Sequence, residues 1–200
     1  MILAGGRGRR IGGGKATVEL GGRPLISYPL AAVRAVLTEV AILAKADTEL
    51  PSLPGTPVWI EPDAPRHPLV GILYALEQTG GRPVLVCAGD LPFVMPALIA
   101  RIAGTEPDGA LAVLAAGAGA VQPLLGCYQP GALGALGPAD GARRGVALRE
   151  AVAVLAPRLL EVEDRESLFN VNSAEDLVRA EAMLAGRPGF VSTSMRPGAE

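Results

Sequence analysis

The sequence contains few of the residues that bind transition metals. It has only two cysteines, Cys87 and Cys127, and one histidine, His67. The cysteines lie in separate apolar segments, without the close spacing or the histidine partners of a zinc site. We therefore expect two buried, unreactive thiols. We expect His67 to be a loop residue near the mouth of a pocket, and a catalytic histidine is the less favoured alternative.

The sequence also lacks an excess of charge and a long apolar run. Its net charge is −2 and its pI is about 5.6, which argues against a nucleic-acid-binding protein with a basic face. No apolar run approaches the roughly 20 residues that span a bilayer, and no charged-then-apolar leader is present. We therefore expect a cytoplasmic protein that binds neither nucleic acid nor membranes.

The N-terminal segment is the most unusual stretch of the chain. Residues 5–15, GGRGRRIGGGK, contain six glycines, three arginines and one lysine. Glycine lets successive backbone N–H groups converge on an oxyanion, while arginine and lysine supply positive charge. We predict a loop that binds a small polyanion, with Lys15 and one or more of Arg7, Arg9 and Arg10 contacting phosphate. The alternative is a solvated, flexible N-terminal segment.

Two common phosphate-binding patterns do not fit this loop. The Walker pattern fails because Ala16 follows Lys15 and Arg9 stands at the first glycine position. The dinucleotide fingerprint fails because Ile11 stands where its third glycine belongs. The sequence therefore excludes an ordinary P-loop NTPase and an ordinary NAD site.

Apolar runs of strand length alternate with segments of helical periodicity. Only residues 1–3 precede the glycine loop, so the first strand is curtailed or the natural start lies upstream. The other predicted strands are residues 39–46, 58–62, 83–90, 110–116, 122–130 and 158–164. The predicted helices are residues 24–37, 69–81, 95–104, 145–156 and 173–184.

Several residues refine these predictions. Pro24 suits a first helical turn, and Pro29 predicts a kink or break. Ser173 and Asp176 form a variant capping box. Half of the residues are hydrophobic, enough for a sizeable core. We expect an α/β three-layer sandwich with a mostly parallel sheet in a single domain, residues 1–185, followed by a disordered tail, residues 186–200.

Two aspartates follow predicted strands, at the sheet edge where ligands of such folds collect. Asp90 follows the most apolar strand and either binds a cation or caps the next helix. Asp63 is either a ligand residue or a turn former. Hard oxygen ligands favour Mg²⁺ over zinc. In this interpretation Asp90 holds Mg²⁺ on the phosphates, while Lys15 and the arginines, Arg10 among them, stabilise the leaving group.

Several motifs in order resemble one known family. The motifs are LAGGRGRRIGGGK, LGGRPLI, EPDAPRHPLVGI, AGDLPFVMP, QPLLGCY and FNVNSAEDL. With them the chain, over nearly its whole length to residue 185, resembles the molybdenum cofactor guanylyltransferases. These are nucleotidyltransferases with a Rossmann-like fold of the nucleotide-diphospho-sugar transferase type. The resemblance implies transfer of GMP from Mg·GTP to the terminal phosphate of the molybdopterin cofactor, with release of pyrophosphate. A molybdoenzyme or a chaperone would accept the product.

The resemblance also implies roles for particular residues. The nucleotide contacts fall on Leu3, Ala4, Gly5, Gly6, Lys15, Asp63 and Asp90. Asp90 binds Mg²⁺ as well, and Asn170 and Asn172 match an Asn-x-Asn motif near the pterin. Several positions depart from the family pattern. Gly14 replaces a common aspartate, Lys45 replaces a usual asparagine, and residues 67–71 read HPLVG in place of GPLAG.

Three alternatives remain open on the sequence alone. A cytidylyl-transferring relative acts on the same cofactor but typically has LAAG where this chain has LAGG. Another sibling would guanylylate phospholactate. The third alternative is a non-catalytic, GTP-binding adaptor that delivers molybdenum cofactor, which would bind GTP without releasing pyrophosphate.

Overall fold

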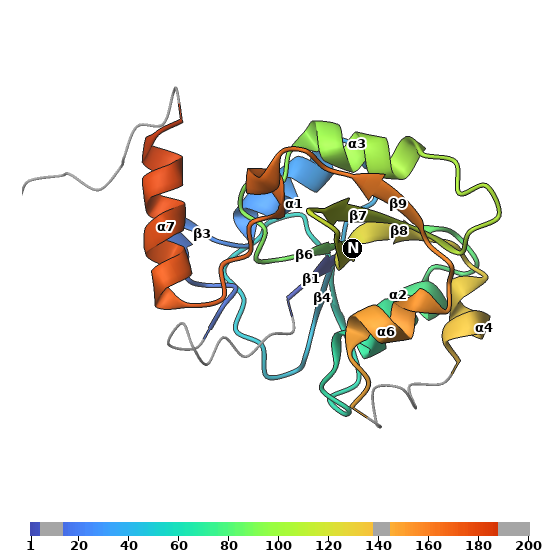
Figure 1. The fold of residues 1–200 in the computed structure, drawn as a ribbon. Helices are drawn as coiled ribbons and strands as arrows, with labels where there is room; N and C mark the ends of the chain where they lie inside the picture. The colour runs from blue at the N-terminus through green and yellow to red at the C-terminus, as the bar shows by residue number, and fades with distance from the viewer. Residues whose placement is uncertain (5–13, 138–144, 188–200) are drawn as a thin grey trace, which may run out of the picture.

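The computed structural model describes residues 1–4, 14–137 and 145–187. Its centre is a seven-stranded sheet with the strand order β5, β4, β1, β6, β8, β7, β9 (Figure 1). The strand bounds are Val58–Ile60 (β5), Ile42–Ala44 (β4), Ile2–Leu3 (β1), Val84–Ala88 (β6), Ala120–Tyr128 (β8), Ala112–Gly117 (β7) and Arg158–Glu161 (β9).

The sheet is mixed but mostly parallel. Strands β5, β4, β1 and β6 are all parallel to one another, and β9 is parallel to β7. Strand β8 is antiparallel to both of its neighbours. Strand β8 runs antiparallel to β7 because a tight hairpin turn joins the two strands. The turn consists of Ala118 and Gly119, with φ values of 50° and 75°. The prediction of a largely parallel sheet is confirmed, with β8 as the exception.

Helices cover both faces of the sheet, which confirms the three layers (Figure 1). Helices α1 (Ser27–Arg34) and α3 (Pro96–Gly104) pack on one face, and α2 (Pro68–Gln78), α4 (Ala132–Leu136) and α6 (Leu148–Ala153) on the other. Side chains of β6 alternate between the two cores, as the pleat of a strand requires. Leu85 and Cys87 join the first core, whereas Val84 and Val86 join the second. All of β6 is buried, as predicted for a central strand.

A smaller unit of structure lies beside the sheet. Helix α7 (Ala174–Ala185) packs against the hairpin of β2 (Glu19–Leu20) and β3 (Arg23–Pro24), and a third apolar cluster joins them. The 3-10 helix η2 (Arg165–Leu168) precedes α7. The predicted capping box is confirmed, since Ser173 and Asp176 each bond the other's backbone N–H.

The prediction for residues 24–37 is wrong in its details. Pro24 belongs to β3, and the helix begins at Ser27. Pro29 therefore lies in the first turn of α1, where a backbone N–H has no partner within the helix. It causes no break, and it is buried in the finished helix.

The remaining expectations concern the cysteines, membranes and the tail. Both thiols are buried, and this burial raises the pKa of Cys87 to about 12 and also raises that of Cys127. Within the described ranges, no helix has the length and apolar character needed to cross a bilayer. Most of the predicted tail, residues 188–200, lies outside the described residues.

Candidate functional site

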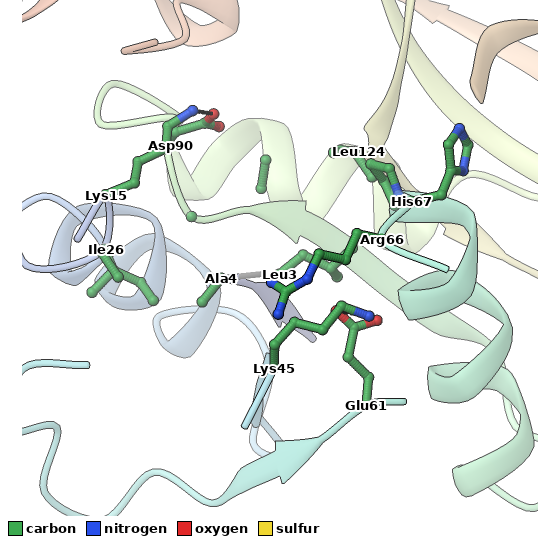
Figure 2. A pocket seen from close by; sticks show the side chains of 14 residues that line it. Leu3, Ala4, Lys15, Ile26, Lys45, Glu61, Arg66, His67, Asp90 and Leu124 are labelled. Carbon is green, nitrogen blue, oxygen red and sulfur yellow. Dashed lines mark hydrogen bonds and ion pairs between the residues drawn. The ribbon is translucent and has the colours of Figure 1, made fainter. Parts of the chain in front are cut away.

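A cavity opens at the carboxyl ends of the four parallel strands. Loops leaving β5, β4, β1 and β6 meet there, as expected for a ligand site in an α/β sheet. The cavity has a volume of about 480 Å³ and is seen from close by in Figure 2. Its lining residues are Leu3, Ala4, Lys15, Ala16, Ile26, Lys45, Glu61, Arg66, His67, Pro68, Ala88, Gly89, Asp90 and Leu124.

Three predicted site residues meet at one end of this cavity. The Lys15 ammonium forms an ion pair with Oδ2 of Asp90 and donates a hydrogen bond of 2.5 Å to Oδ1 of Asn172. The side chains of Lys15 and Asp90 are each 17% exposed. The other carboxylate oxygen, Oδ1 of Asp90, is buried and has no hydrogen-bond partner among the described residues.

The backbone holds this cluster in place. The turn that delivers Lys15 is closed by a hydrogen bond of 2.7 Å from Thr17 N–H to the Gly14 carbonyl. Val171 N–H donates to the backbone carbonyl of Asp90 at 3.0 Å. The segment before α7 is therefore joined directly to the loop that follows β6. Asn172 reaches Lys15 because of this connection.

A second pair at the cavity, Lys45 and Glu61, was not predicted. Lys45 follows β4 and Glu61 follows β5, and their side chains are 3% and 8% exposed. Lys45 Nζ lies 3.3 Å from Glu61 Oε1 and also donates to the Pro62 carbonyl. Glu61 Oε2 is buried without a hydrogen-bond partner in the described chain.

The environment of Glu61 opposes its charge. Burial raises the pKa of the Glu61 carboxyl, and the Lys45 ammonium partly offsets this shift. The sequence held a signal for this pair, since both residues directly follow apolar strands. The alternation of strands alone did not show that two side chains of opposite charge would be buried together.

The rim of the cavity contains Arg66 and His67. Arg66 forms an ion pair of 2.7 Å with Asp47. His67 caps α2, because its Nδ1 accepts a hydrogen bond of 3.2 Å from Leu69 N–H. Its ring points away from Lys15 and Asp90 (Figure 2). This position agrees with the expected loop residue near the pocket mouth.

The other predicted site residues fall into three groups. Leu3 and Ala4 line the cavity, as expected. Asp63 is exposed and Asn170 is half-buried, and neither is among the residues that line the cavity in the described chain. Gly5, Gly6 and Arg10, with Arg7 and Arg9, lie outside the described residues. The roles of all these residues stay predictions.

The fit of a divalent cation depends on Asp90. In the described ranges no three His, Cys, Asp or Glu side chains gather in a cluster that could hold a metal. Beside Lys15 the described residues offer the Asp90 carboxylate, whose buried Oδ1 lacks a partner among them. Mg²⁺ is commonly held by one or two carboxylates together with substrate phosphates. Asp90 fits that kind of site, with most ligands supplied by a phosphorylated substrate and water.

Comparisons with known proteins agree on one family. The profile of the MobA-like NTP transferase domain matches residues 1–159. The chain is 38% identical over 192 residues to the molybdenum cofactor guanylyltransferase of Cereibacter sphaeroides, covering 92% of this chain and 95% of that protein.

Two solved structures are similar in fold. The first is the molybdopterin-guanine dinucleotide biosynthesis protein A of Archaeoglobus fulgidus, with a TM-score of 0.75 and 26% identity, covering 93% of this chain and 98% of that one. The second is the 2-C-methyl-D-erythritol 4-phosphate cytidylyltransferase of Thermus thermophilus, with a TM-score of 0.63 and 25% identity. The match covers 91% of this chain and 97% of that one.

Proposed function

This chain belongs to the MobA-like NTP transferase family, and we propose that it transfers GMP from GTP to the terminal phosphate of the molybdopterin cofactor. The chain is thus a nucleotidyltransferase, a molybdenum cofactor guanylyltransferase. The observation that best supports this reaction is the Lys15–Asp90 pair on the cavity, in a chain that matches a guanylyltransferase over nearly its whole length.

The reaction exchanges one phosphoryl bond for another. An oxygen of the cofactor's terminal phosphate attacks the α-phosphorus of GTP and forms a new P–O bond. The bond between the α-phosphorus and the bridging oxygen breaks, and pyrophosphate leaves with the electron pair. A phosphate oxygen is already a nucleophile, so the protein needs to supply position and charge rather than a general base.

Lys15 supplies positive charge for the phosphates. Its ammonium lies at the cavity between Asp90 and Asn172, and it is partly exposed, so it can contact a triphosphate. Lysine is a compact point charge that suits several phosphate geometries. We propose that Lys15 holds the phosphates of GTP and stabilises the charge that develops on pyrophosphate.

Asp90 is the residue that would hold Mg²⁺. The unpartnered Oδ1 is a hard oxygen donor at the cavity, and an anionic triphosphate beside Asp90 would be repelled without a cation. When bound, Mg²⁺ neutralises phosphate charge and polarises the phosphorus–oxygen bonds. Asp90 and Lys15 thereby set the position of the triphosphate relative to the acceptor.

The proposed catalytic unit extends beyond the segment that matches the family profile. That match ends at residue 159, whereas Asn172 bonds to Lys15. We therefore include α7 and treat residues 1–185 as one catalytic domain. Asn170 and Asn172 are proposed to face the pterin substrate, and the finished cofactor would pass to a molybdoenzyme or a chaperone.

Pyrophosphate release tests this proposal directly. The protein is supplied with Mg²⁺ and molybdopterin cofactor, and with GTP, CTP or ATP in parallel reactions. Release with GTP alone is the expected result. Release with CTP instead would assign a cytidylyltransferase. Binding of GTP with no release from any nucleotide would favour a non-catalytic adaptor.

A further inference from the structure

The Lys45–Glu61 pair lies at the opposite end of the cavity from Lys15 and Asp90. Glu61, Lys45, Ala4 and Asp90 follow β5, β4, β1 and β6, which are neighbours in that order. Adjacent strands are about 4.8 Å apart, so two to three strand spacings, about 10 to 14 Å, separate the pair from Asp90. Figure 2 shows Leu3 and Ala4 between the two charged groups. This separation suits a nucleotide, with phosphates at Asp90 and the base at the pair.

The carboxylate of Glu61 has an unused hydrogen-bonding capacity. Its Oε1 contacts Lys45, but its Oε2 is buried without a donor among the described residues. An unpartnered buried carboxylate oxygen is costly, and native proteins normally provide it with a donor. Glu61 also lines the cavity, so its unused capacity to accept a hydrogen bond lies at the edge of the ligand site.

Helix α2 is shaped to leave room for this carboxylate. A Cβ atom at Gly71 would lie 3.0 Å from Glu61 Oε2 and 3.2 Å from side-chain carbons of Leu3 and Leu43. A Cβ at this position would require these neighbours to shift by a few tenths of an ångström. Gly71 of α2 therefore lies directly beside the Glu61 carboxylate.

We propose that Glu61 and Lys45 recognise the guanine base of GTP, an inference that rests on the proposed function. A carboxylate only accepts hydrogen bonds, and an ammonium only donates them. The pairing edge of guanine presents one acceptor, O6, followed by two donors, N1–H and the 2-amino group. Lys45 donates to O6, and Glu61 accepts from the two donors. Cytosine and adenine each present a single amino donor beside a ring acceptor, so neither supplies two adjacent donors to one carboxylate.

Inosine triphosphate is the probe that isolates this contact. It differs from GTP only by lacking the 2-amino group. We expect the wild-type protein with Mg²⁺ to bind GTP at least tenfold more tightly than ITP, measured by isothermal titration calorimetry. In Glu61→Gln the ratio should approach one, mainly through weaker GTP binding, since a site that bonds a polar group discriminates against analogues without it.

Two further variants make the test specific. Glu61→Asp keeps a negative charge near Lys45, but its shorter side chain moves the carboxylate oxygens away from the base. This variant should fold and still lose the preference for GTP over ITP. Glu39→Gln removes a carboxylate from a well-exposed ion pair with Arg82, and it should leave both affinities unchanged. Thermal unfolding checks that each variant is folded.

The outcomes separate this inference from the proposed function. Equal wild-type affinities for GTP and ITP, or an unchanged ratio in a folded Glu61 variant, would overturn the base-recognition role. If such a protein still released pyrophosphate with GTP, the proposed function would stand. Turnover with CTP in place of GTP would overturn the proposed function, and guanine recognition by Glu61 with it.

Discussion

Asn172 accepts a hydrogen bond from the ammonium of Lys15, although 157 residues separate them in the sequence. The same ammonium forms an ion pair with Asp90, so three distant segments meet at one charged group. Each segment is anchored by a short backbone contact, including the bond from Val171 N–H to the Asp90 carbonyl. The geometry of Lys15 therefore depends on the packing of α7 as well as on the N-terminal turn.

Asp90→Asn should lower Mg²⁺-dependent transfer by roughly 10- to 100-fold while leaving the fold intact. The amide is isosteric but neutral, and a lost charge-assisted contact costs roughly 1.5 to 3 kcal/mol. The measurement is pyrophosphate release over a Mg²⁺ titration, together with thermal unfolding. Asp108→Asn is a matched control, because Asp108 pairs with Arg158 on the surface. Near-normal turnover in Asp90→Asn would contradict the assignment of Asp90.

Lys15→Ala and Asn172→Ala should not have additive effects. Lys15→Ala should raise the KM for GTP through the loss of a phosphate contact. Asn172→Ala should raise it about tenfold or more, because a hydrogen bond donated by a charged ammonium is worth roughly 1.5 to 3 kcal/mol. In the double variant the Asn172 effect should largely disappear, since its partner is gone. Full additivity in this double-mutant cycle would show that Asn172 acts independently of Lys15.

The architecture could be predicted from the sequence because it depends on local pattern. The continuous apolar run of β6 and the amphipathic periodicity of α3 are both visible in the sequence, and the structure has a strand and a helix there. The hairpin of β2 and β3 was missed because its strands are two residues each, too short for any period. Pro24 was placed in the helix for a related reason, since a proline suits both a first turn and a strand end.

The site could be predicted only where a single charged residue stands out from its local sequence. Asp90, at the end of a central strand, and Lys15, after a glycine-rich loop, are conspicuous on their own. Glu61 is not, because a glutamate after an apolar strand is ordinarily solvated. Its burial depends on Lys45, which approaches from a different strand, and such a pairing is determined by tertiary packing.

Asp176→Asn should destabilise the protein, and the loss should depend on pH. Backbone N–H groups of Asn172 and Ser173 donate to the Asp176 carboxylate, each at 3.0 Å. These bonds, that from Asn172 above all, lower the pKa of Asp176 below its ordinary value of 3.8. The stabilisation is therefore present above that value and is lost as the pH falls through the lower, folded-state pKa.

Urea unfolding of the wild-type protein and Asp176→Asn between pH 2.5 and 7 would measure this effect. The gap in unfolding free energy should be about 1 kcal/mol near neutral pH, the usual contribution of a helix cap. It should shrink in acid. A gap that is constant over the whole pH range would contradict a role for the ionised carboxylate. Glu175→Gln, an exposed neighbour in the same turn, is the control.

Glu61→Gln should show the opposite pH dependence. Burial raises the pKa of Glu61 above its ordinary value of 4.5, against the opposing effect of Lys45. A folded state with a raised carboxyl pKa gains stability below the unfolded-state pKa and loses it as the pH rises through the folded-state value. The wild-type protein should therefore lose stability relative to Glu61→Gln as the pH rises above 4.5. Urea unfolding of both proteins across this range measures the difference in their unfolding free energies. If the wild type became more stable relative to Glu61→Gln as the pH rose, the result would contradict the raised pKa.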